Sequence, residues 1–238
     1  MERYSVIKGK FPREFLLLQG TGCRWRRCSF CDYYEDVCPT PYESTNREVL
    51  DRVTGEFGVL DIINSGSALE LDPATIAAIQ KVVKDKEIHT LWFEMHYMYR
   101  NRLEAFAQLF APAVVKFRCG VETFDAQLRD RWQKGIGAGV TPQEIAEYFK
   151  GVCLLCCTDT PGDTRERVLK DIALAEEYFE YYSLNLFCPN GTPLKRDEEM
   201  ANWLVKEIYP SLLHSSKAEV LIDNTDLGVG GVPIYSFI

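Results

Sequence analysis

The sequence predicts an α/β fold, a partial (β/α)6 TIM-like barrel in a single domain over residues 1–238, and two observations lead to it. Short apolar runs alternate with stretches of helical periodicity, in the order strand then helix. This alternation indicates parallel strands joined by right-handed crossovers. The chain has 238 residues, whereas a closed eight-fold barrel typically needs about 250. Because a long loop and a C-terminal tail use part of that length, an open barrel fits better.

The predicted strands are short apolar runs bounded by polar or turn residues. They cover residues 15–20, 59–64, 89–95, 114–121, 152–157 and 182–187, with a further short strand at 220–223. The predicted helices lie between them and are set by capping residues and apolar periodicity. They cover residues 45–53, 72–83, 101–110, 126–133, 142–150, 163–179 and 197–213. The first begins at a capping box, Thr45-Asn-Arg-Glu48, and the second at Asp72-Pro73, where a cap precedes a proline.

Composition narrows the class of protein. The formal net charge of −8 argues against broad binding to a nucleic-acid backbone. No apolar run reaches the 18 residues of a membrane span, and the N-terminus does not read as a signal peptide. The number of cysteines is nine, which is odd, so reduced thiols in a cytoplasmic protein are expected rather than a disulfide scaffold.

A loop over residues 21–34 follows the first predicted strand and contains Cys23, Cys28 and Cys31. Three thiolates this close together suit a soft metal or an iron–sulfur cluster. A structural zinc site normally takes four ligands, with Cys38 as the fourth here. The loop position would put an iron that lacks a protein ligand at the mouth of the barrel, where active sites of such folds lie. Structural zinc has no reason to prefer that place, so we favour the cluster.

This arrangement resembles the radical S-adenosylmethionine superfamily, with Phe30 as the aromatic residue just before the last cysteine. The resemblance covers nearly the whole chain. It implies a [4Fe–4S] cluster on the three cysteines, whose fourth iron binds S-adenosylmethionine. It also implies a one-electron donor, such as flavodoxin or ferredoxin, and cleavage of the cofactor to a 5′-deoxyadenosyl radical. The cysteine spacing departs from the usual pattern of the superfamily, in which three residues separate the first two cysteines and two separate the last two. Here four residues separate Cys23 from Cys28, and two separate Cys28 from Cys31.

The same resemblance implies where S-adenosylmethionine binds. Ser65-Gly66-Ser67 ends the second strand beside the methionine moiety, where small residues permit close backbone approach. Glu122 closes the fourth strand near the ribose, and Thr160 lies in the turn that faces adenine after the fifth. Ordinary turn and capping chemistry is the alternative for each of these segments.

Substrate specificity must come from other residues at the carboxyl ends of the strands and in the tail over about 214–238. The candidate substrate-binding residues are Glu94, His96, Tyr97, Arg100, Asn185, Asn190, Asp223 and Asp226. A carboxylate among them would pair in bidentate fashion with the adjacent donors of a 7-deazaguanine. A surface histidine is the alternative for His96, and a solvated loop is the alternative for the tail.

The chain has no second cysteine cluster and no RNA-binding extension, so we expect a small-molecule substrate and no direct nucleic-acid or membrane partner. The segments 94–100 and 189–197 resemble those of radical enzymes that act on the free base queuine, a 7-deazapurine. That resemblance implies a lyase that breaks a C–N bond and releases 7-aminomethyl-7-deazaguanine (preQ1). Candidate hydrogen donors to the product radical are Cys156, Cys157 and Tyr97. The alternatives are another small heterocycle or nucleoside as substrate, and a zinc-binding ligand or adaptor domain.

Overall fold

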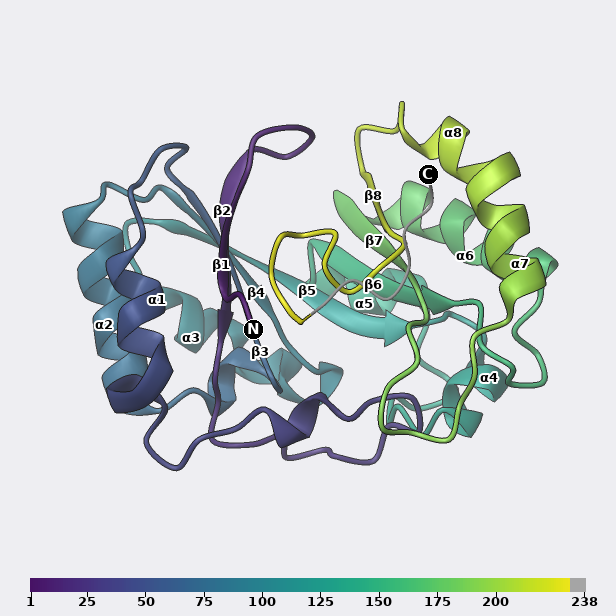
Figure 1. The fold of residues 1–238 in the computed structure, drawn as a ribbon, viewed down its shortest axis with the longest axis horizontal. Helices are drawn as coiled ribbons and strands as arrows, with labels where there is room; N and C mark the ends of the chain where they lie inside the picture. Colours follow the sequence, from purple (N-terminus) through teal and green to yellow (C-terminus); the bar gives the residue numbers. More distant parts are fainter. Residues whose placement is uncertain (232–238) are drawn as a thin grey trace. The chain divides into compact units, whose positions relative to one another are not determined.

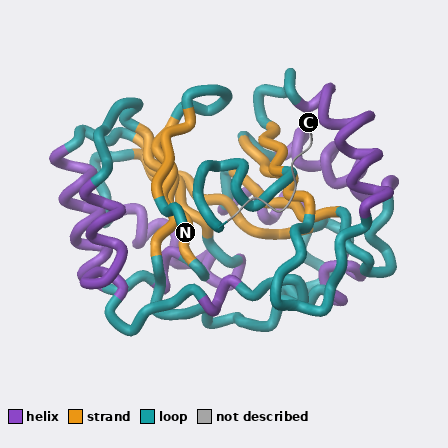
Figure 2. The backbone as a smooth tube through the Cα atoms, in the orientation of Figure 1, coloured by secondary structure: helices purple, strands orange, loops and turns teal. Residues whose placement is uncertain are grey.

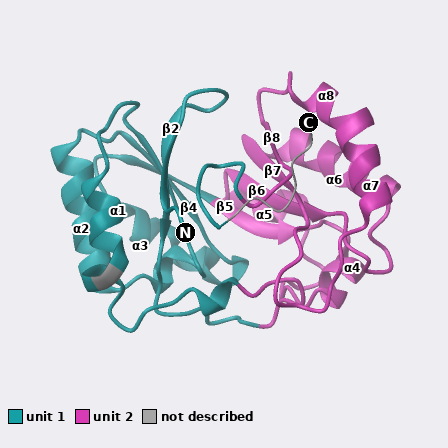
Figure 3. Ribbon diagram, in the orientation of Figure 1, with its two compact units in different colours: residues 1–26, 33–117, 225–232 teal, residues 27–32, 118–224, 233–238 magenta. Residues whose placement is uncertain are grey.

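The structure, a computed structural model, describes residues 1–231 (Figure 1). The chain forms two compact units (Figure 3). Unit 1 comprises residues 1–26, 33–117 and 225–231. Unit 2 comprises residues 27–32 and 118–224. The cysteine loop is therefore shared, since Cys23 belongs to unit 1 whereas Cys28 and Cys31 belong to unit 2.

Unit 1 is built on strands that follow one another in sequence order. These are β1 (Tyr4–Ile7), β2 (Arg13–Leu18), β3 (Val59–Asn64) and β4 (Thr90–Glu94), together with the start of β5 (Val114–Glu122). β1 runs antiparallel to β2, whereas β2, β3 and β4 are parallel. β1 was not predicted, because a run of four residues gives little periodicity to detect.

The helices of unit 1 lie together on one face of its strands (Figures 1 and 2). They are α1 (Arg47–Asp51), α2 (Pro73–Asp85) and α3 (Leu103–Gln108). The loops of this unit also contain the short turns η1 (Tyr33–Glu35), η2 (Tyr42–Asn46), η3 (Ala68–Glu70) and η4 (Tyr97–Arg102). The predicted α2 start is confirmed, since the Asp72 side chain accepts from the backbone N–H groups of Ala74 and Thr75. Apolar side chains such as Leu16, Ile62 and Phe93 are fully buried and form the core.

The capping box predicted at Thr45 is wrong. The chain already turns helically from Tyr42, with π geometry, and α1 continues that turn. Thr45 therefore lies inside a helical turn and not before one, and α1 begins after Asn46, whose side chain does not cap it. The Asn46 amide instead bonds the backbone N–H and the carbonyl of Gln19, each at 2.8 Å.

Unit 2 continues the alternation with parallel strands in sequence order. These are the rest of β5, β6 (Gly151–Cys156), β7 (Tyr181–Leu186) and β8 (Ala218–Leu221). The helices are α4 (Ala126–Arg131), α5 (Pro142–Tyr148), α6 (Arg165–Tyr178), α7 (Glu198–Trp203) and α8 (Tyr209–Leu212). The helix predicted at 197–213 is interrupted by the π-helical turn η5 (Leu204–Ile208), directly before Pro210 in α8. Proline has no N–H to continue the helical ladder, which accounts for the break.

The described residues include no helix that is long and apolar enough to cross a membrane. Of the tail predicted over about 214–238, the part beyond residue 231 lies outside the described residues. The part before it forms β8 and the turns up to residue 231.

Candidate active site

The first half of the cysteine loop is fastened within unit 1 by one carboxylate, Glu70. Its Oε1 accepts from the backbone N–H of Arg24 at 2.9 Å and from the Tyr99 hydroxyl at 2.8 Å. Its Oε2 accepts from the backbone N–H of Ser67 at 2.6 Å. The backbone carbonyl of Glu70 also accepts from the backbone N–H and the hydroxyl of Thr21. Hydrogen bonds to an ionised acceptor are about twice as strong as neutral ones, so Glu70 fixes the loop firmly.

Sequence reasoning missed Glu70, although a signal for it was present. Ser67 and Glu70 form a capping box around η3, which is the pattern that an S-x-x-E string predicts. Burial and the Glu70 carboxylate together raise the pKa of Tyr99 to about 12. The Tyr99 phenol therefore stays protonated at neutral pH and remains a donor to Glu70.

Ser65, Gly66 and Ser67, the predicted methionine-side turn, lie directly beside this half of the loop. A Cβ atom added at Gly66 would lie 3.2 Å from the Cα of Cys23 and would collide with the Glu70 carboxylate. The Ser65 hydroxyl accepts from the backbone N–H of Gly20 at 3.4 Å. The glycine is therefore required for the loop to pack against the end of β3.

His96 is also part of this arrangement. Its ring stacks on Trp25 of the loop, with ring centroids 5.4 Å apart and an interplanar angle of 24°. Its Nδ1 accepts from the backbone N–H of Met98 at 3.1 Å, so the ring nitrogen Nε2 carries the proton when the histidine is neutral. Its backbone N–H donates to the Ser67 hydroxyl at 2.9 Å. The structure thus gives His96 a contact with the loop.

The second half of the loop is held within unit 2 by several separate contacts. The backbone N–H of Ser29 donates to the carbonyl of Trp132 at 3.1 Å. The Phe30 ring packs edge-on against Trp132 at a centroid distance of 5.9 Å. The Asn190 side chain donates to the Phe30 carbonyl at 2.8 Å, and the Asp32 carboxylate accepts from the backbone N–H of Gly191 at 2.6 Å. Asn190, predicted to bind substrate, therefore holds the loop in this structure.

Glu122 and Lys134 form a buried ion pair behind Phe30. The Lys134 ammonium lies 2.8 Å from Glu122 Oε1 and 5.7 Å from the centre of the Phe30 ring. Both side chains are about one-tenth exposed. Burial lowers the pKa of Lys134, but Glu122 and Cys28 outweigh it, so that the pKa is raised and the lysine stays charged. The predicted ribose ligand Glu122 thus already has a cationic partner, which sequence reasoning did not find.

Thr160 and the cysteine pair at the end of β6 occupy the other predicted positions of unit 2. The Thr160 hydroxyl accepts from the Trp132 indole N–H at 2.9 Å. Cys156 and Cys157 are fully buried, with sulfur atoms 3.6 Å apart. Burial raises the pKa of the Cys156 thiol well above its usual value, so it stays protonated. Hydrogen donation by either thiol, or by the buried Tyr97, stays a prediction.

The remaining substrate candidates divide by unit. In unit 1, Glu94 ends β4 half-buried, Arg100 places its guanidinium 4.7 Å from the centre of the Tyr97 ring, and Asp226 is exposed. In unit 2, Asp223 is buried. The Oδ1 atom of Asn185 on β7 is buried and accepts no hydrogen bond from the described residues. A buried acceptor without a donor is costly, so this atom fits a ligand that brings an N–H or O–H group.

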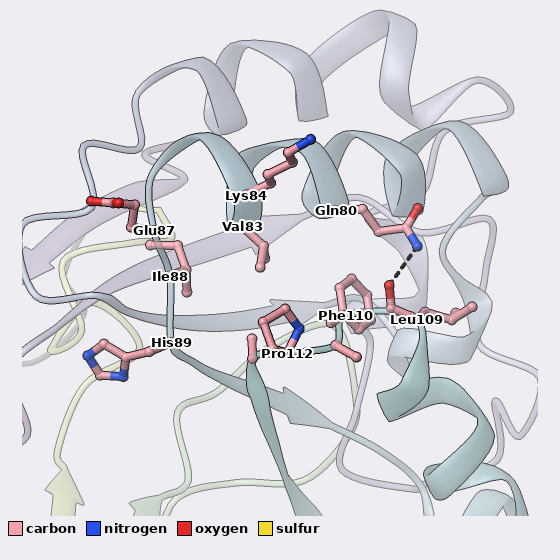
Figure 4. A pocket seen from close by; sticks show the side chains of 11 residues that line it. Gln80, Val83, Lys84, Glu87, Ile88, His89, Leu109, Phe110 and Pro112 are labelled. Carbon is pink, nitrogen blue, oxygen red and sulfur yellow. Dashed lines mark hydrogen bonds between the residues drawn. The ribbon is translucent and has the colours of Figure 1, made fainter.

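A pocket of ≈ 570 Å³ in unit 1 lies elsewhere (Figure 4). Its lining includes Ile88 and His89 just before β4, and Ala113 just before β5. Gln80 donates to the Leu109 carbonyl across it, at 2.7 Å. It therefore borders the amino ends of these strands, whereas ligands of parallel α/β sheets bind at the carboxyl ends.

The donor chemistry of the cysteine loop fits an iron–sulfur cluster. Cys23, Cys28 and Cys31 are half-buried thiols, and no disulfide joins the nine cysteines of the described residues. The backbone N–H of Arg26 donates to the sulfur of Cys23 at 3.4 Å, a contact that stabilises a thiolate. No group of three His, Cys, Asp or Glu side chains within residues 1–231 has the geometry of a preformed metal site. The ligand assignment therefore rests on the spacing of the cysteines in the loop.

Parallel strands in sequence order, with a three-cysteine loop after the first of them, define a radical S-adenosylmethionine enzyme. A search of solved structures sharpens this class. The structure of queuine lyase from Clostridium spiroforme bound to SAM and queuine matches over 97% of this chain and 100% of that chain, at 39% sequence identity and a TM-score of 0.90. The chain belongs to the queuine lyase family.

This match confirms the predicted fold class, a partial TIM-like barrel of radical S-adenosylmethionine type, and the predicted enzyme class. No family model and no curated protein matches the chain. The individual site residues and the single-domain assignment stay predictions.

Proposed function

We propose that this chain is a radical S-adenosylmethionine lyase that cleaves queuine and releases 7-aminomethyl-7-deazaguanine. The observation that carries this proposal is the match, along nearly the whole chain, to a queuine lyase bound to SAM and queuine. The three-cysteine loop after β2 supports it, because thiolates at this edge of the sheet suit a [4Fe–4S] cluster.

The cluster would be held by Cys23, Cys28 and Cys31, and it supplies the electron that converts S-adenosylmethionine into methionine and a 5′-deoxyadenosyl radical. The remaining work falls to this chain's own residues. Glu70 and the glycine at position 66 fix the loop against the end of β3. The ring of Phe30 and the pair of Glu122 and Lys134 form its support in unit 2.

Queuine would be bound by polar groups at the carboxyl ends of the strands. The free Oδ1 atom of Asn185 requires a donor, and the 7-deazaguanine part of queuine presents several N–H groups on one edge. Glu94 and Asp226 in unit 1, and Asp223 in unit 2, stay candidate carboxylates for recognising the base, and Tyr97 is the candidate for stacking. Because Asn190 and His96 already contact the loop, we assign them a positioning role.

The electron would come from a flavodoxin or ferredoxin in the cytoplasm, a reducing compartment that suits nine cysteines without disulfides. The acidic net charge of −8 supports a small-molecule substrate over a nucleic acid.

The test is anaerobic turnover with chemically defined components. Protein reconstituted with iron and sulfide is given dithionite, S-adenosylmethionine and queuine, and the products are separated by mass-resolved chromatography. We expect 7-aminomethyl-7-deazaguanine and 5′-deoxyadenosine to accumulate together, and neither to form without S-adenosylmethionine. A colourless protein that contains one zinc and leaves queuine intact would contradict the proposal.

A further inference from the structure

Arginines gather on two segments of unit 1 next to the first cysteine of the loop. Arg24 and Arg26 follow Cys23, and Arg100 and Arg102 lie on η4. We call these four side chains the basic surface. Arg24, Arg26 and Arg102 are exposed and Arg100 is half-exposed. Neither stretch, 21–31 or 95–103, contains an Asp or Glu, although the whole chain carries a net charge of −8.

Two contacts place these segments side by side. Trp25 of the loop stacks on His96, the residue that caps η4. Glu70 accepts both from the backbone N–H of Arg24 and from the hydroxyl of Tyr99 on η4. The arginines of both segments therefore belong to one surface of unit 1.

The guanidinium groups are also partly fixed. Arg26 lies over the Tyr34 ring at 4.4 Å from its centre, and Arg100 lies over the Tyr97 ring at 4.7 Å. Stacking of this kind limits the rotamers of an arginine without neutralising its charge. The acidic groups close to these arginines in the chain are Glu94 and Glu104 on either side of η4, and Asp32 and Glu35 after the cysteine loop, while the carboxylate of Glu70 is engaged by three donors. Four guanidinium groups on two stretches without a carboxylate make this surface locally basic.

The place of this surface points to its use. The backbone N–H of Arg26 contacts the sulfur of Cys23, so the surface adjoins a proposed cluster ligand. We propose that the basic surface docks an acidic one-electron carrier protein, which delivers the electron required for the cleavage of S-adenosylmethionine. This inference rests on the proposed function and adds the partner surface to it. For each S-adenosylmethionine cleaved, the reduced carrier loses one electron and the enzyme gains that electron.

Charge reversal tests the proposal. Two variants of the reconstituted holoenzyme are compared with the wild-type protein. The single variant, Arg102→Glu, reverses one charge outside the cysteine loop, and the double variant, Arg24→Glu with Arg102→Glu, reverses two. The probe is reduced flavodoxin, and the rate of queuine cleavage with flavodoxin is divided by the rate with dithionite in the same preparation. We expect the double variant to lower this ratio at least about ten-fold at low ionic strength, and the single variant about three-fold. The loss of flavodoxin-dependent rate should shrink at about 1 M salt, where the screening length falls to about 3 Å.

The matched control is Lys170→Glu with Lys206→Glu, two exposed lysines on helices of unit 2, which changes the net charge by the same amount. Direct binding of flavodoxin to the holoenzyme, measured by calorimetry, should weaken only in the arginine variants. An unchanged ratio and unchanged binding in the double variant would overturn the inference. So would an equal loss in the lysine control, or tight binding of RNA that competes with flavodoxin. Absence of queuine cleavage with dithionite in the wild-type protein would instead contradict the proposed function.

Discussion

The two halves of the cysteine loop are held in different ways. Residues up to Arg26, in unit 1, are held mainly through Glu70, whose carboxylate joins Arg24 of the loop to Ser67 and Tyr99 and whose carbonyl accepts from Thr21. Residues 27–32, in unit 2, depend on several separate contacts, among them the Asn190 side chain on the Phe30 carbonyl. When several hydrogen bonds meet at one carboxylate, a single substitution there should destabilise the loop strongly. When the contacts come from different residues, each substitution should remove only part of the stability.

This difference has a chemical reason. The first half begins directly at the end of β2 and packs against glycine at position 66, so there is little space for side chains between loop and sheet. A carboxylate can satisfy several backbone and phenolic donors there at once. The second half contains Phe30, which packs against Trp132 and lies near the ammonium of Lys134. An aromatic ring can be supported by apolar packing and by a buried cation.

The largest expected effect comes from the cysteines, because they span both halves. Cys23→Ala in unit 1 and Cys31→Ala in unit 2 should each reduce the iron content from about four per chain to near zero and abolish queuine cleavage. Cys38→Ala should retain both iron and activity. Retained iron in Cys23→Ala, or an emptied site in Cys38→Ala, would favour a different ligand set and the zinc alternative.

The next largest effect concerns the ion pair that supports the second half. Lys134→Met leaves Glu122 buried without its cation and should lower the free energy of unfolding by about 3–5 kcal/mol. Glu122→Gln in addition should restore much of it, as measured by urea unfolding. The folded-state pKa of Lys134 is raised, so its contribution is complete below the ordinary lysine pKa and is lost only as the pH rises through the folded value. The free energy of unfolding lost in Lys134→Met should therefore be about the same at pH 6 and at pH 9. A loss under about 1 kcal/mol would be typical of an exposed pair and would contradict the buried one.

Glu70→Gln tests the carboxylate that holds the first half. The neutral amide directs an N–H group towards one of the donors that the carboxylate satisfied, so about 1.5–3 kcal/mol of stability should be lost. We expect slower queuine cleavage by about ten-fold and weaker retention of iron, because the loop is displaced. Glu104→Gln, at an exposed position on α3, serves as the control. Equal behaviour of the two variants would show that Glu70 does not position the loop.

Asn190→Ala should have the smallest effect on activity of the series. It removes three neutral hydrogen bonds, one to the Phe30 carbonyl and two from Thr192, each worth about 1 kcal/mol, while the packing of Phe30 on Trp132 remains. A drop in activity of about two- to three-fold, with the KM for queuine unchanged, fits a positioning role. A large rise in that KM would instead place Asn190 against the substrate, as the sequence predicted.

The fold could be predicted from the sequence largely because its strands and helices are set by local periodicity. The predicted strand at 114–121 agrees with β5 to within one residue, and the helix at 142–150 with α5 to within two. Errors arose where the helical geometry departs from the regular α-helix. Thr45 lies inside the π-helical turn η2 instead of capping a helix, and η5 interrupts, next to Pro210, a helix that periodicity would continue.

The cysteine ligands could be proposed from spacing alone, since their chemistry is local to one loop. Glu70 and Lys134 could not be found in that way, because their roles come from contacts across 46 and 12 residues of sequence. In the sequence, Lys134 follows an amphipathic helix as an ordinary surface lysine would. Only the folded chain brings its ammonium to 2.8 Å from Glu122.

The most direct measurement of the central claim uses queuine deuterated on its cyclopentenediol ring. If the chain generates a 5′-deoxyadenosyl radical that attacks this ring, deuterium must appear in the 5′-deoxyadenosine formed during release of 7-aminomethyl-7-deazaguanine. Mass spectrometry of the 5′-deoxyadenosine detects this transfer. Product release with 5′-deoxyadenosine that stays free of deuterium, from queuine labelled at every ring carbon, would contradict the account.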